Sequence, residues 1–334
     1  MNDQLTGQEI RLAARPAGEP GPEHFELATV PVPELKDGQV LVRNTWISVD
    51  PYMRGRMDDE PGALPPFELG KVMDGSAIGE VIASRAPAIP VGATVNHFLG
   101  WREYSVVDAA AAIVEDVTLA PAEAYLGVLG TTGLTAYAAL TDVTGVKEGD
   151  VVFVSAAAGA VGSVAGQIAR QLGAAKVIGS AGGPLKTKKL LADFGYDAAL
   201  DYKAGDLAGQ LEAAAPDGID VYLDNVGGSH LQAALDRLNP GGRVALIGAV
   251  SGYNTPMPPA DNLVQAVYKS LSLRGMQVAN YFPLFPEYVG HALGWIAAGR
   301  LHTEQTVVDG LDQAPAALIG VLRGENTGKM LVRL

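Results

Sequence analysis

Short segments rich in branched and aromatic residues fill the first third of the chain, between Glu9 and Glu115. Clusters of proline, glycine and aspartate separate them, and polar residues interrupt each apolar run after a few positions. This spacing predicts an all-β unit. The segments that we expect to be extended are EIRLAA, HFELATV, QVLVRNTWISV, GSAIGEVIAS and EYSVVDA.

The pattern changes between about Leu129 and Leu293, where apolar runs alternate with stretches of helical period. Such alternation is typical of a parallel α/β sheet. We therefore place a domain boundary near Gly127–Gly130. Six strands are expected, as in a complete dinucleotide-binding sheet. They are Val151–Ser155, Val177–Gly179, Ala198–Asp201, Val221–Asp224, Val244–Gly248 and Leu271–Met276.

The last part of the chain is expected to return to the first domain. Glu287–Ala298 reads as a helix, and the segments TVVDG and GKMLVRL read as strands with a helix at Leu311–Leu322 between them. The predicted organisation is therefore a β domain over residues 1–128, an α/β domain over 129–294 and a returning tail over 295–334.

The most specific local pattern is VVFVSAAAGAVGSVAGQIARQLGA, a strand followed by a glycine-containing turn and a helix. The turn resembles the Rossmann fingerprint with Ala157 in its first glycine place. Gly159 would let the backbone approach a pyrophosphate, and Gly162 would allow close packing of helix and strand. Tight packing without a ligand is the alternative reading of the turn alone.

The second predicted strand of this domain ends in VIGSAGG and carries no Asp or Glu. NAD-binding sheets place an acid there to accept the ribose 2′-hydroxyl. Lys186 follows instead, and Tyr202 and Lys203 come after the third strand. A missing carboxylate and an available ammonium favour NADPH over NADH, although Lys186 could also be an ordinary solvated lysine.

Composition narrows the possible functions. Apolar residues make up 48% and charged residues 18% of the 334 positions, as in a globular protein with large cores. The formal net charge of −13 opposes binding to nucleic acid or to anionic lipid. No stretch has the length and apolarity of a secretion signal or a membrane span, so a cytoplasmic location is expected.

The chain contains no cysteine, which excludes disulfides, thiolate nucleophiles and thiolate metal ligands. Its five histidines, His24, His97, His230, His291 and His302, show no pair at metal-ligand spacing. We expect no metal site. A reaction at a carbonyl-containing substrate would then need hydrogen-bond donors to stabilise charge on oxygen.

Several separated motifs resemble one known family. AAAGAVGSVAGQIARQLGA, DYK, DNVGG, GAVSGYN and ENTGK appear in order, preceded by VDPYMRGRM and GTTGLTAY. Together they resemble the zinc-independent medium-chain dehydrogenases/reductases, near the prostaglandin reductase/leukotriene hydroxydehydrogenase, alkenal double-bond reductase and curcumin-reductase-like group. The resemblance covers nearly the whole chain.

This resemblance implies a fold, an activity and a set of site residues. The fold would be a GroES-like β-barrel domain joined to a Rossmann domain, with NADP(H) and substrate in the cleft between them. The activity would be reduction of the carbon–carbon double bond of an α,β-unsaturated ketone or aldehyde, with Tyr253 stabilising the enolate and Tyr52 and Tyr281 near the substrate. The implied cofactor-binding residues are Gly159, Ala160, Val161, Gly162, Lys186, Tyr202, Asn225, Gly248, Ala249, Val250, Ser251, Tyr253, Met276, Gln277, Val278 and Asn326.

Two departures from the family pattern concern the substrate side. Thr132 stands where relatives commonly carry proline, and Met276–Phe282 differs from the more usual aromatic-led stretch. Quinone reduction by the same fold, and nucleotide binding without catalysis, remain alternatives. The family also suggests a homodimer formed by edge-to-edge pairing of Rossmann sheets.

Overall fold

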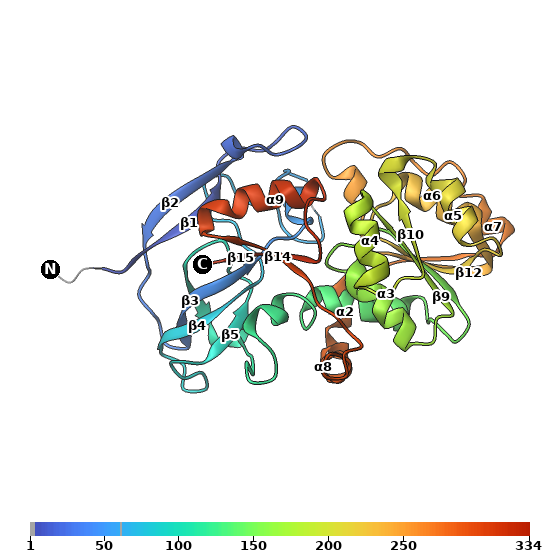
Figure 1. The fold of residues 1–334 in the computed structure, drawn as a ribbon. Coiled ribbons are helices and arrows are strands. Elements are labelled where there is room, and N and C mark those ends of the chain that lie inside the picture. The colour runs from blue at the N-terminus through green and yellow to red at the C-terminus, as the bar shows by residue number, and fades with distance from the viewer. Residues whose placement is uncertain (1–3, 61) are drawn as a thin grey trace. The chain divides into compact units, whose positions relative to one another are not determined.

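The computed structural model describes residues 4–60 and 62–334, and the chain divides into two compact units (Figure 1). The first unit contains the residues up to Gly127, Thr306–Glu325 and Met330–Leu334. The second unit contains Val128–Gln305 and Asn326–Lys329. None of the helices in the described residues is long and apolar enough to cross a membrane.

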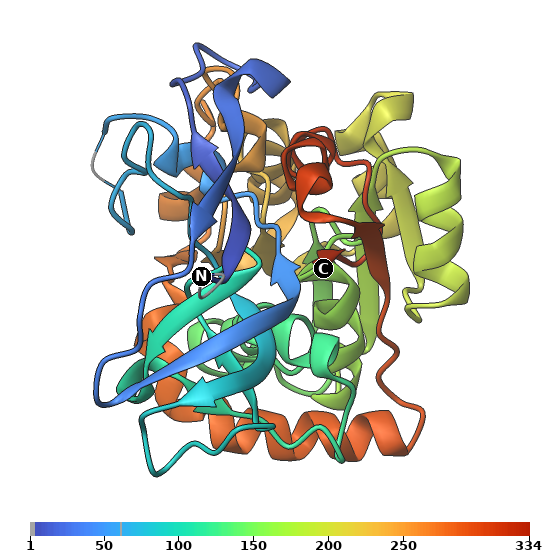
Figure 2. The ribbon, with the colours of Figure 1, turned by 90° about the vertical axis from the view of Figure 1, so that its left-hand side faces the viewer.

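The first unit is built mainly from antiparallel strands, which lie toward the viewer in Figure 2. A two-stranded sheet pairs β1 with β2, and a second sheet has the order β14-β15-β3-β4-β5-β7, with β6 also paired to β3. No pairing among the described strands joins β14 to β7, so hydrogen bonds do not close this sheet into a ring. The strands are β1 (Thr6–Leu12), β2 (Phe25–Pro31), β3 (Gln39–Ser48), β4 (Ala77–Ser84), β5 (Thr94–His97), β6 (Tyr104–Asp108), β7 (Ile113–Val114), β14 (Gln305–Asp309) and β15 (Lys329–Arg333).

The tail supplies strands and a helix to the first unit. β15 pairs antiparallel with β3, and Leu318 of the tail helix is buried in the same core cluster as Ile47. Proline near the start of that helix suits a position where its missing N–H is not needed. The helices of this unit are η1 (Pro22–His24), α1 (Met53–Arg56), η2 (Ala109–Ala111), η3 (Ala122–Leu126), η8 (Leu311–Gln313) and α9 (Ala314–Leu322).

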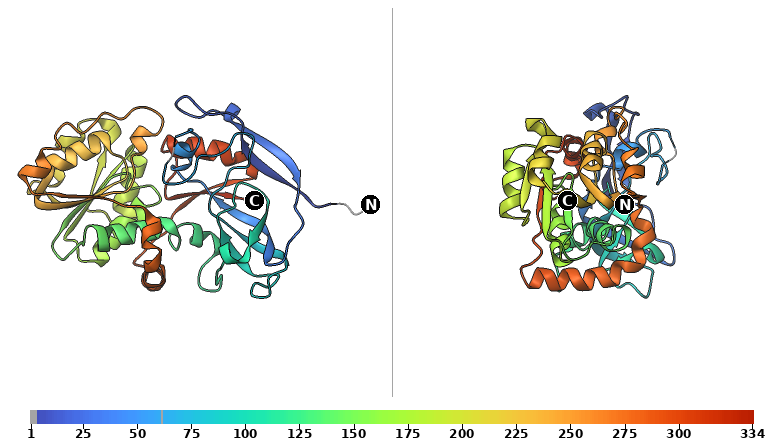
Figure 3. Two further views of the ribbon diagram at one scale, coloured as in Figure 1. Left: turned by 180° about the vertical axis from the view of Figure 1, so that it is seen from behind. Right: turned by 90° about the vertical axis from the view of Figure 1, so that its right-hand side faces the viewer.

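The second unit contains the predicted six-stranded parallel sheet, and its order β10-β9-β8-β11-β12-β13 is that of a dinucleotide-binding fold. The view from behind in Figure 3 shows this sheet between its helices. The sequence prediction of a Rossmann-type sheet beside a separate β unit is confirmed. The six strands are β8 (Val151–Val154), β9 (Lys176–Ala181), β10 (Ala198–Asp201), β11 (Ile219–Asp224), β12 (Leu238–Leu246) and β13 (Ser272–Gly275).

Alternating side chains explain why these segments form a sheet covered on both faces. Phe153 of β8 and Tyr222 of β11 stack with their ring centroids 5.0 Å apart, in a cluster with Leu211 and Leu235. Val152 and Val154, which point the other way along β8, are also completely buried. The helices of this unit are α2 (Thr131–Ala138), η4 (Ala139–Val143), α3 (Gly162–Gln171), α4 (Pro184–Ala192), η5 (Tyr202–Ala204), α5 (Leu207–Ala214), α6 (Gly228–Arg237), η6 (Val250–Gly252), α7 (Gln265–Tyr268), η7 (Val278–Leu284) and α8 (Phe285–Ala297).

Candidate functional site

The turn between β8 and α3 has no room for larger side chains. A Cβ atom on Gly162 would lie 2.4 Å from the Ala156 carbonyl oxygen and 2.5 Å from the Ala157 Cα. Ala156 itself has a φ of 48°, in the left-handed region that a non-glycine residue adopts at a cost. The Ala157 amide donates to the Ser180 carbonyl on β9 at 2.8 Å, which ties the turn to the sheet.

The start of α3 leaves backbone donors without acceptors. Ser163 and Ala165 donate to the carbonyls of Gly159 and Val161, but the amides of Val161 and Gly162 find no acceptor among the described residues. Unpaired N–H groups at a helix start, beside a turn that excludes side chains, fit a diphosphate. The residues of this turn therefore fit the pyrophosphate of a dinucleotide.

A buried polar network joins this strand to the next one in the sheet. Asp224, at the end of β11, accepts hydrogen bonds from the Tyr222 hydroxyl at 2.8 Å and from the Val226 and Gly227 amides at 3.0 and 2.8 Å. The Asn225 side chain donates to the Ser155 carbonyl at 2.8 Å. Burial raises the pKa of Asp224, while the amides of Gly227 and Val226 oppose that rise. The network holds the turn after β11 rigidly.

Tyr253 lies in the loop that follows β12. Its hydroxyl oxygen would be 3.6 Å from a Cβ atom on Gly248, so the phenol lies against the backbone of its own loop. Burial raises the pKa of Tyr253, and a hydrogen bond with the Ala249 backbone opposes that rise. Because the amide donates to the phenol oxygen, the hydroxyl proton stays available to an outside acceptor. The Ser251 hydroxyl donates to the Val226 carbonyl at 2.6 Å and ties this loop to the turn after β11.

The predicted 2′-phosphate residues follow two neighbouring strands of the sheet. Lys186 is in α4, after β9, and its ammonium donates to the Asn326 carbonyl at 2.5 Å. Tyr202 follows β10, and its ring meets the His230 ring edge-on at a centroid distance of 5.3 Å. Sequence reasoning did not select His230, which is buried and has an Nε2 atom without a hydrogen-bond partner among the described residues.

The tail returns to the dinucleotide turn at Asn326. Gly328 forms an isolated parallel bridge with Gly159, and its amide donates to the Ala158 carbonyl at 2.8 Å. The Asn326 side chain, which is buried, donates to the Gly328 carbonyl at 2.7 Å. The structure therefore brings Asn326, Lys186 and the dinucleotide turn together, although they are far apart in the sequence.

The segment after β13 leads into a firmly anchored helix. The Met276 amide donates to the Leu246 carbonyl at 3.1 Å, Gln277 precedes η7, and Tyr281 is buried within it. Helix α8 follows, and its Tyr288 hydroxyl donates to the Val128 carbonyl. The same hydroxyl would be 2.1 Å from a Cβ atom on Gly133, so the second glycine of GTTGLTAY is a packing requirement.

Tyr52 is the one predicted site residue in the first unit. Its hydroxyl is buried and has no hydrogen-bond partner among the described residues, and the same is true of the Trp101 Nε1 atom. Both atoms lie near Gly75, at 3.6 and 3.7 Å from the position of a Cβ atom there. Burial, followed by the charge of Asp50, raises the pKa of Tyr52 above its ordinary value. A buried donor without a partner is a candidate for binding an outside oxygen.

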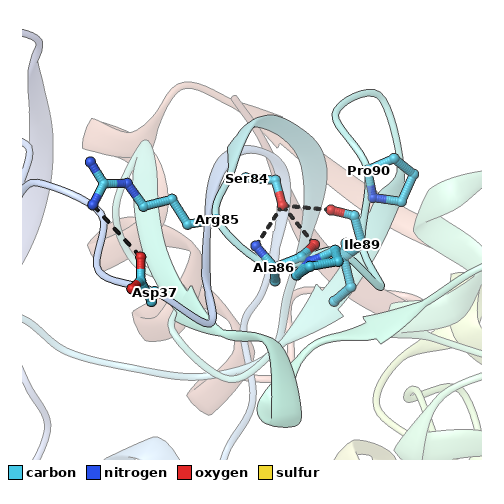
Figure 4. Close-up of a pocket in the computed structure, with 7 residues that line it drawn as sticks. Asp37, Ser84, Arg85, Ala86, Ile89 and Pro90 are labelled. Atoms are coloured by element: carbon cyan, nitrogen blue, oxygen red, sulfur yellow. Dashed lines mark hydrogen bonds and ion pairs between the residues drawn. The ribbon is translucent and has the colours of Figure 1, made fainter.

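A cavity of about 520 Å³ lies elsewhere in the first unit, beside the turn after β4 (Figure 4). The Ser84 hydroxyl there contacts the Ala86 and Ile89 carbonyls, and Arg85 lies 4.0 Å from Asp37. These polar groups are used to hold the turn itself. None of the predicted site residues lines this cavity, so its size does not identify the functional site.

Sequence reasoning missed Ser155, Tyr222 and Asp224, which hold the turns at the end of β8 and β11. The DNVGG motif was noticed, but Asn225 was selected from it rather than the aspartate. An acid at the end of an apolar strand was the available signal, since a carboxylate in that place must find donors. The structure shows that the backbone of the following turn supplies them.

Comparison with known proteins identifies the family. Residues 8–114 match a family model described as the N-terminal domain of oxidoreductase, and residues 160–297 match one described as zinc-binding dehydrogenase. NADPH-dependent curcumin reductase of Escherichia coli is 38% identical over 97% of this chain and 95% of its own length. NADP(+)-dependent 2-alkenal reductase of Nicotiana tabacum is 36% identical over 99% of this chain and 98% of its own.

A solved structure agrees over the same extent. CurA from Vibrio vulnificus, crystallised in complex with NADPH, is 37% identical and superposes with a TM-score of 0.93 over 98% of both chains. The resemblance drawn from the motifs is thereby confirmed. The chain belongs to the medium-chain dehydrogenase/reductase family.

Proposed function

We propose that this protein is an NADPH-dependent reductase of the carbon–carbon double bond in α,β-unsaturated ketones and aldehydes. The observation that carries the proposal is Tyr253, whose phenol oxygen is held by the backbone of its loop while its proton remains available. Relatives named for NADPH-dependent curcumin reduction and for 2-alkenal reduction, each matching nearly the whole chain, support this substrate class.

Residues of the second unit would hold the cofactor. The turn Gly159–Gly162, in which the amides of Val161 and Gly162 are unpaired within the described residues, would bind the pyrophosphate, and Lys186 with Tyr202 would bind the 2′-phosphate. NADPH, when bound, supplies a hydride to the β-carbon of the substrate. The other residues that we assign to the cofactor are Asn225, the loop Gly248–Tyr253, the segment Met276–Val278 and Asn326.

Charge that develops on the substrate oxygen needs a donor, and we assign that part to Tyr253. A hydride that enters the β-carbon of an enone would push electrons through the conjugated system to the carbonyl oxygen, and the α-carbon would then take a proton from Tyr253 or from water. A fixed hydroxyl stabilises that charge more in the transition state than in the ground state. Because the pKa of Tyr253 is raised, the phenol keeps its proton at neutral pH. We propose Tyr52 and Tyr281 as substrate-binding residues, and the Tyr52 hydroxyl is buried without a hydrogen-bond partner among the described residues.

We propose that the reaction needs no zinc, although one matching family model is described by zinc binding. The chain lacks cysteine, so the thiolate ligands common in zinc-dependent alcohol dehydrogenation cannot be built. An enone needs less polarisation than an alcohol, because conjugation already spreads the developing charge. Hydrogen-bond donors therefore take the part that a Lewis acid would otherwise play.

The organisation that we propose follows the sequence boundaries. Residues 1–128 would serve the substrate, 129–294 would bind NADP, and 295–334 would return to the first domain. We also propose a cytoplasmic homodimer. β13 is an edge strand of its sheet, and the nearby Leu263, Val267 and Tyr268 are exposed apolar residues, as expected of a surface that another copy covers.

A substrate panel tests the proposed function. The purified protein is given NADPH with enones, enals and simple quinones, and cofactor oxidation is followed by absorbance. We expect turnover of enones and enals with formation of the saturated carbonyl product. Turnover of quinones alone would replace this proposal with quinone reduction, and NADPH binding without any turnover would favour a non-catalytic protein. Dialysis against a chelator should leave the rate unchanged, and recovery with added zinc would refute the metal-free mechanism.

A further inference from the structure

The position just after β9 decides how this fold treats the ribose of its cofactor. In NAD-binding sheets of this topology, an acid at the end of the second strand accepts the 2′-hydroxyl. The strand order makes β9 the second strand, and it ends at Ala181. The next residue is Gly182, so the place of the acid holds no side chain of its own.

Side chains from the neighbouring loop fill the space above Gly182. A Cβ atom on this glycine would lie 2.8 Å from the Tyr202 hydroxyl oxygen and 2.9 Å from the Lys203 Cε. Both residues belong to η5, which follows β10, the strand paired with β9. Where an NAD-binding protein carries a carboxylate, this chain therefore presents a phenol and an ammonium.

One carboxylate holds both loops in this arrangement. A single oxygen of Asp201 accepts from the Gly183 amide at 2.8 Å and from the Lys203 amide at 3.0 Å. The Gln210 side chain closes the η5 turn by donating to the carbonyls of Asp201 at 3.0 Å and Gly205 at 2.6 Å. Lys203 is thus attached to a fixed backbone rather than to a loose loop.

The charge of Lys203 is not neutralised by the protein. Its side chain is exposed and forms no ion pair within residues 4–60 and 62–334, whereas the Lys186 ammonium already donates to the Asn326 carbonyl. The Tyr202 ring packs edge-on against the buried His230 ring, with the two ring centroids 5.3 Å apart. The Lys203 ammonium and the Tyr202 hydroxyl are thus held on a fixed turn, and the Asp201 carboxylate at that turn is bonded to backbone amides.

We propose that Lys203 is a further specificity-determining residue, which binds the 2′-phosphate of NADPH together with Tyr202 and in addition to Lys186. Asp201 is a positioning residue, because its carboxylate fixes the Lys203 backbone and the Gly182–Gly183 turn relative to each other. The inference rests on the proposed use of NADPH and adds the residues that distinguish it from NADH.

Binding titrations with the whole protein test the role of Lys203. Lys203→Met is compared with wild type and with Lys188→Met, a matched control that removes an exposed lysine from nearby α4. Dissociation constants for NADPH and NADH are measured by quenching of tryptophan fluorescence, without substrate. Losing a charge-assisted contact should weaken NADPH binding by roughly ten- to a hundredfold and leave NADH binding unchanged. The same titrations with adenosine 2′,5′-bisphosphate and adenosine 5′-monophosphate measure the contribution of the 2′-phosphate, because the two nucleotides differ only in that group.

The possible results separate the inference from the proposed function. If Lys203→Met and Lys188→Met both bind NADPH like wild type, Lys203 is an ordinary surface lysine and the inference is wrong. If wild type itself binds NADH as tightly as NADPH, the proposed cofactor preference is wrong. Equal losses for NADPH and NADH in Lys203→Met would assign Lys203 to the fold of the loop and would also overturn the inference.

A second pair of variants tests Asp201. Asp201→Ala removes the acceptor of both amides, so we expect weaker NADPH binding with a smaller change for NADH. Asp201→Asn keeps an oxygen acceptor in the same place and should restore most of the preference. Failure of the asparagine variant to rescue binding, with an unchanged melting temperature, would remove the positioning role from Asp201.

Discussion

The turn after β8 and the turn after β9 follow adjacent strands of one sheet, but they are built in opposite ways. After β8, the amides of Val161 and Gly162 are unpaired among the described residues, and Gly162 has no space for even a methyl group. After β9, the Tyr202 and Lys203 side chains fill the space above Gly182, and we assign the chemistry to side chains, those of Lys186, Tyr202 and Lys203.

A binding site made of packed backbone should be destroyed by one added methyl group. In a site made of side chains, each substitution should remove one contact and weaken binding by a limited amount. The predictions for Gly162 and Lys186 test this difference directly. Those for Tyr253 and His230 test side chains from other loops and helices of the same unit.

The largest effect is expected from Gly162→Ala. The added methyl group would overlap the Ala156 carbonyl, and overpacking of this kind costs about 1 to 3 kcal/mol of stability. The displaced turn should also lose measurable NADPH binding. Gly290→Ala is the control, because that glycine lies in α8 with open space around it and should become about 0.5 to 1 kcal/mol more stable. If Gly162→Ala kept the NADPH affinity and the melting temperature of wild type, the turn after β8 would tolerate a side chain and the contrast between the two turns would be wrong.

Tyr253→Phe should give the next largest effect, on turnover alone. The ring remains and only the hydroxyl is removed, so packing and NADPH affinity should stay near wild type. Loss of one fixed donor to a developing oxyanion lowers turnover by roughly a hundred- to a thousandfold. Single-turnover measurements of hydride transfer to an enone check this. An unchanged rate would mean that Tyr253 only lines the site and that another donor stabilises the charge on the substrate oxygen.

Lys186→Met should weaken NADPH binding by roughly ten- to a hundredfold, because it removes a charge-assisted contact. The Michaelis constant for NADH should hardly change, since NADH has no 2′-phosphate. The Lys186 ammonium also donates to the Asn326 carbonyl, so the melting temperature of the variant must be measured beside its kinetics. Equal losses with both cofactors would mean that Lys186 serves the tail rather than the phosphate.

The last effect is confined to acid pH and concerns stability. Burial lowers the pKa of His230 from 6.5 to about 4, so between these values the unfolded chain binds a proton that the folded chain does not. Stability should therefore fall as pH falls through this window, by about 1.4 kcal/mol per pH unit for this residue. The free energy of unfolding, measured with urea at a series of pH values, should change less steeply with pH in His230→Phe than in wild type. The slope of the variant will not vanish, because burial lowers the pKa of His97 to about 3.

Much of the fold was predictable from local pattern. The alternation of apolar runs with helical stretches predicted six strands in the second unit, because each element must bury one face wherever it lies in the chain. The glycine turn before α3 was recognisable for a similar reason. Gly159 and Gly162 mark a backbone conformation and a close approach that other residues would prevent. The absence of cysteine and of an acid after β9 is a property of the sequence itself.

Only the tertiary structure decided which residues meet. Lys186 contacts Asn326 across 140 positions, and Asn225 contacts Ser155 across 70. Tyr202 and Lys203 cover Gly182 because β10 pairs with β9, and a Cβ atom on Gly75 would be crowded by the Met53 side chain at 2.5 Å. Hydrophobic periodicity records how each segment faces its neighbours. Contacts between distant residues depend on the order of the strands and on the space left beside a missing side chain, and neither is written in any short stretch of sequence.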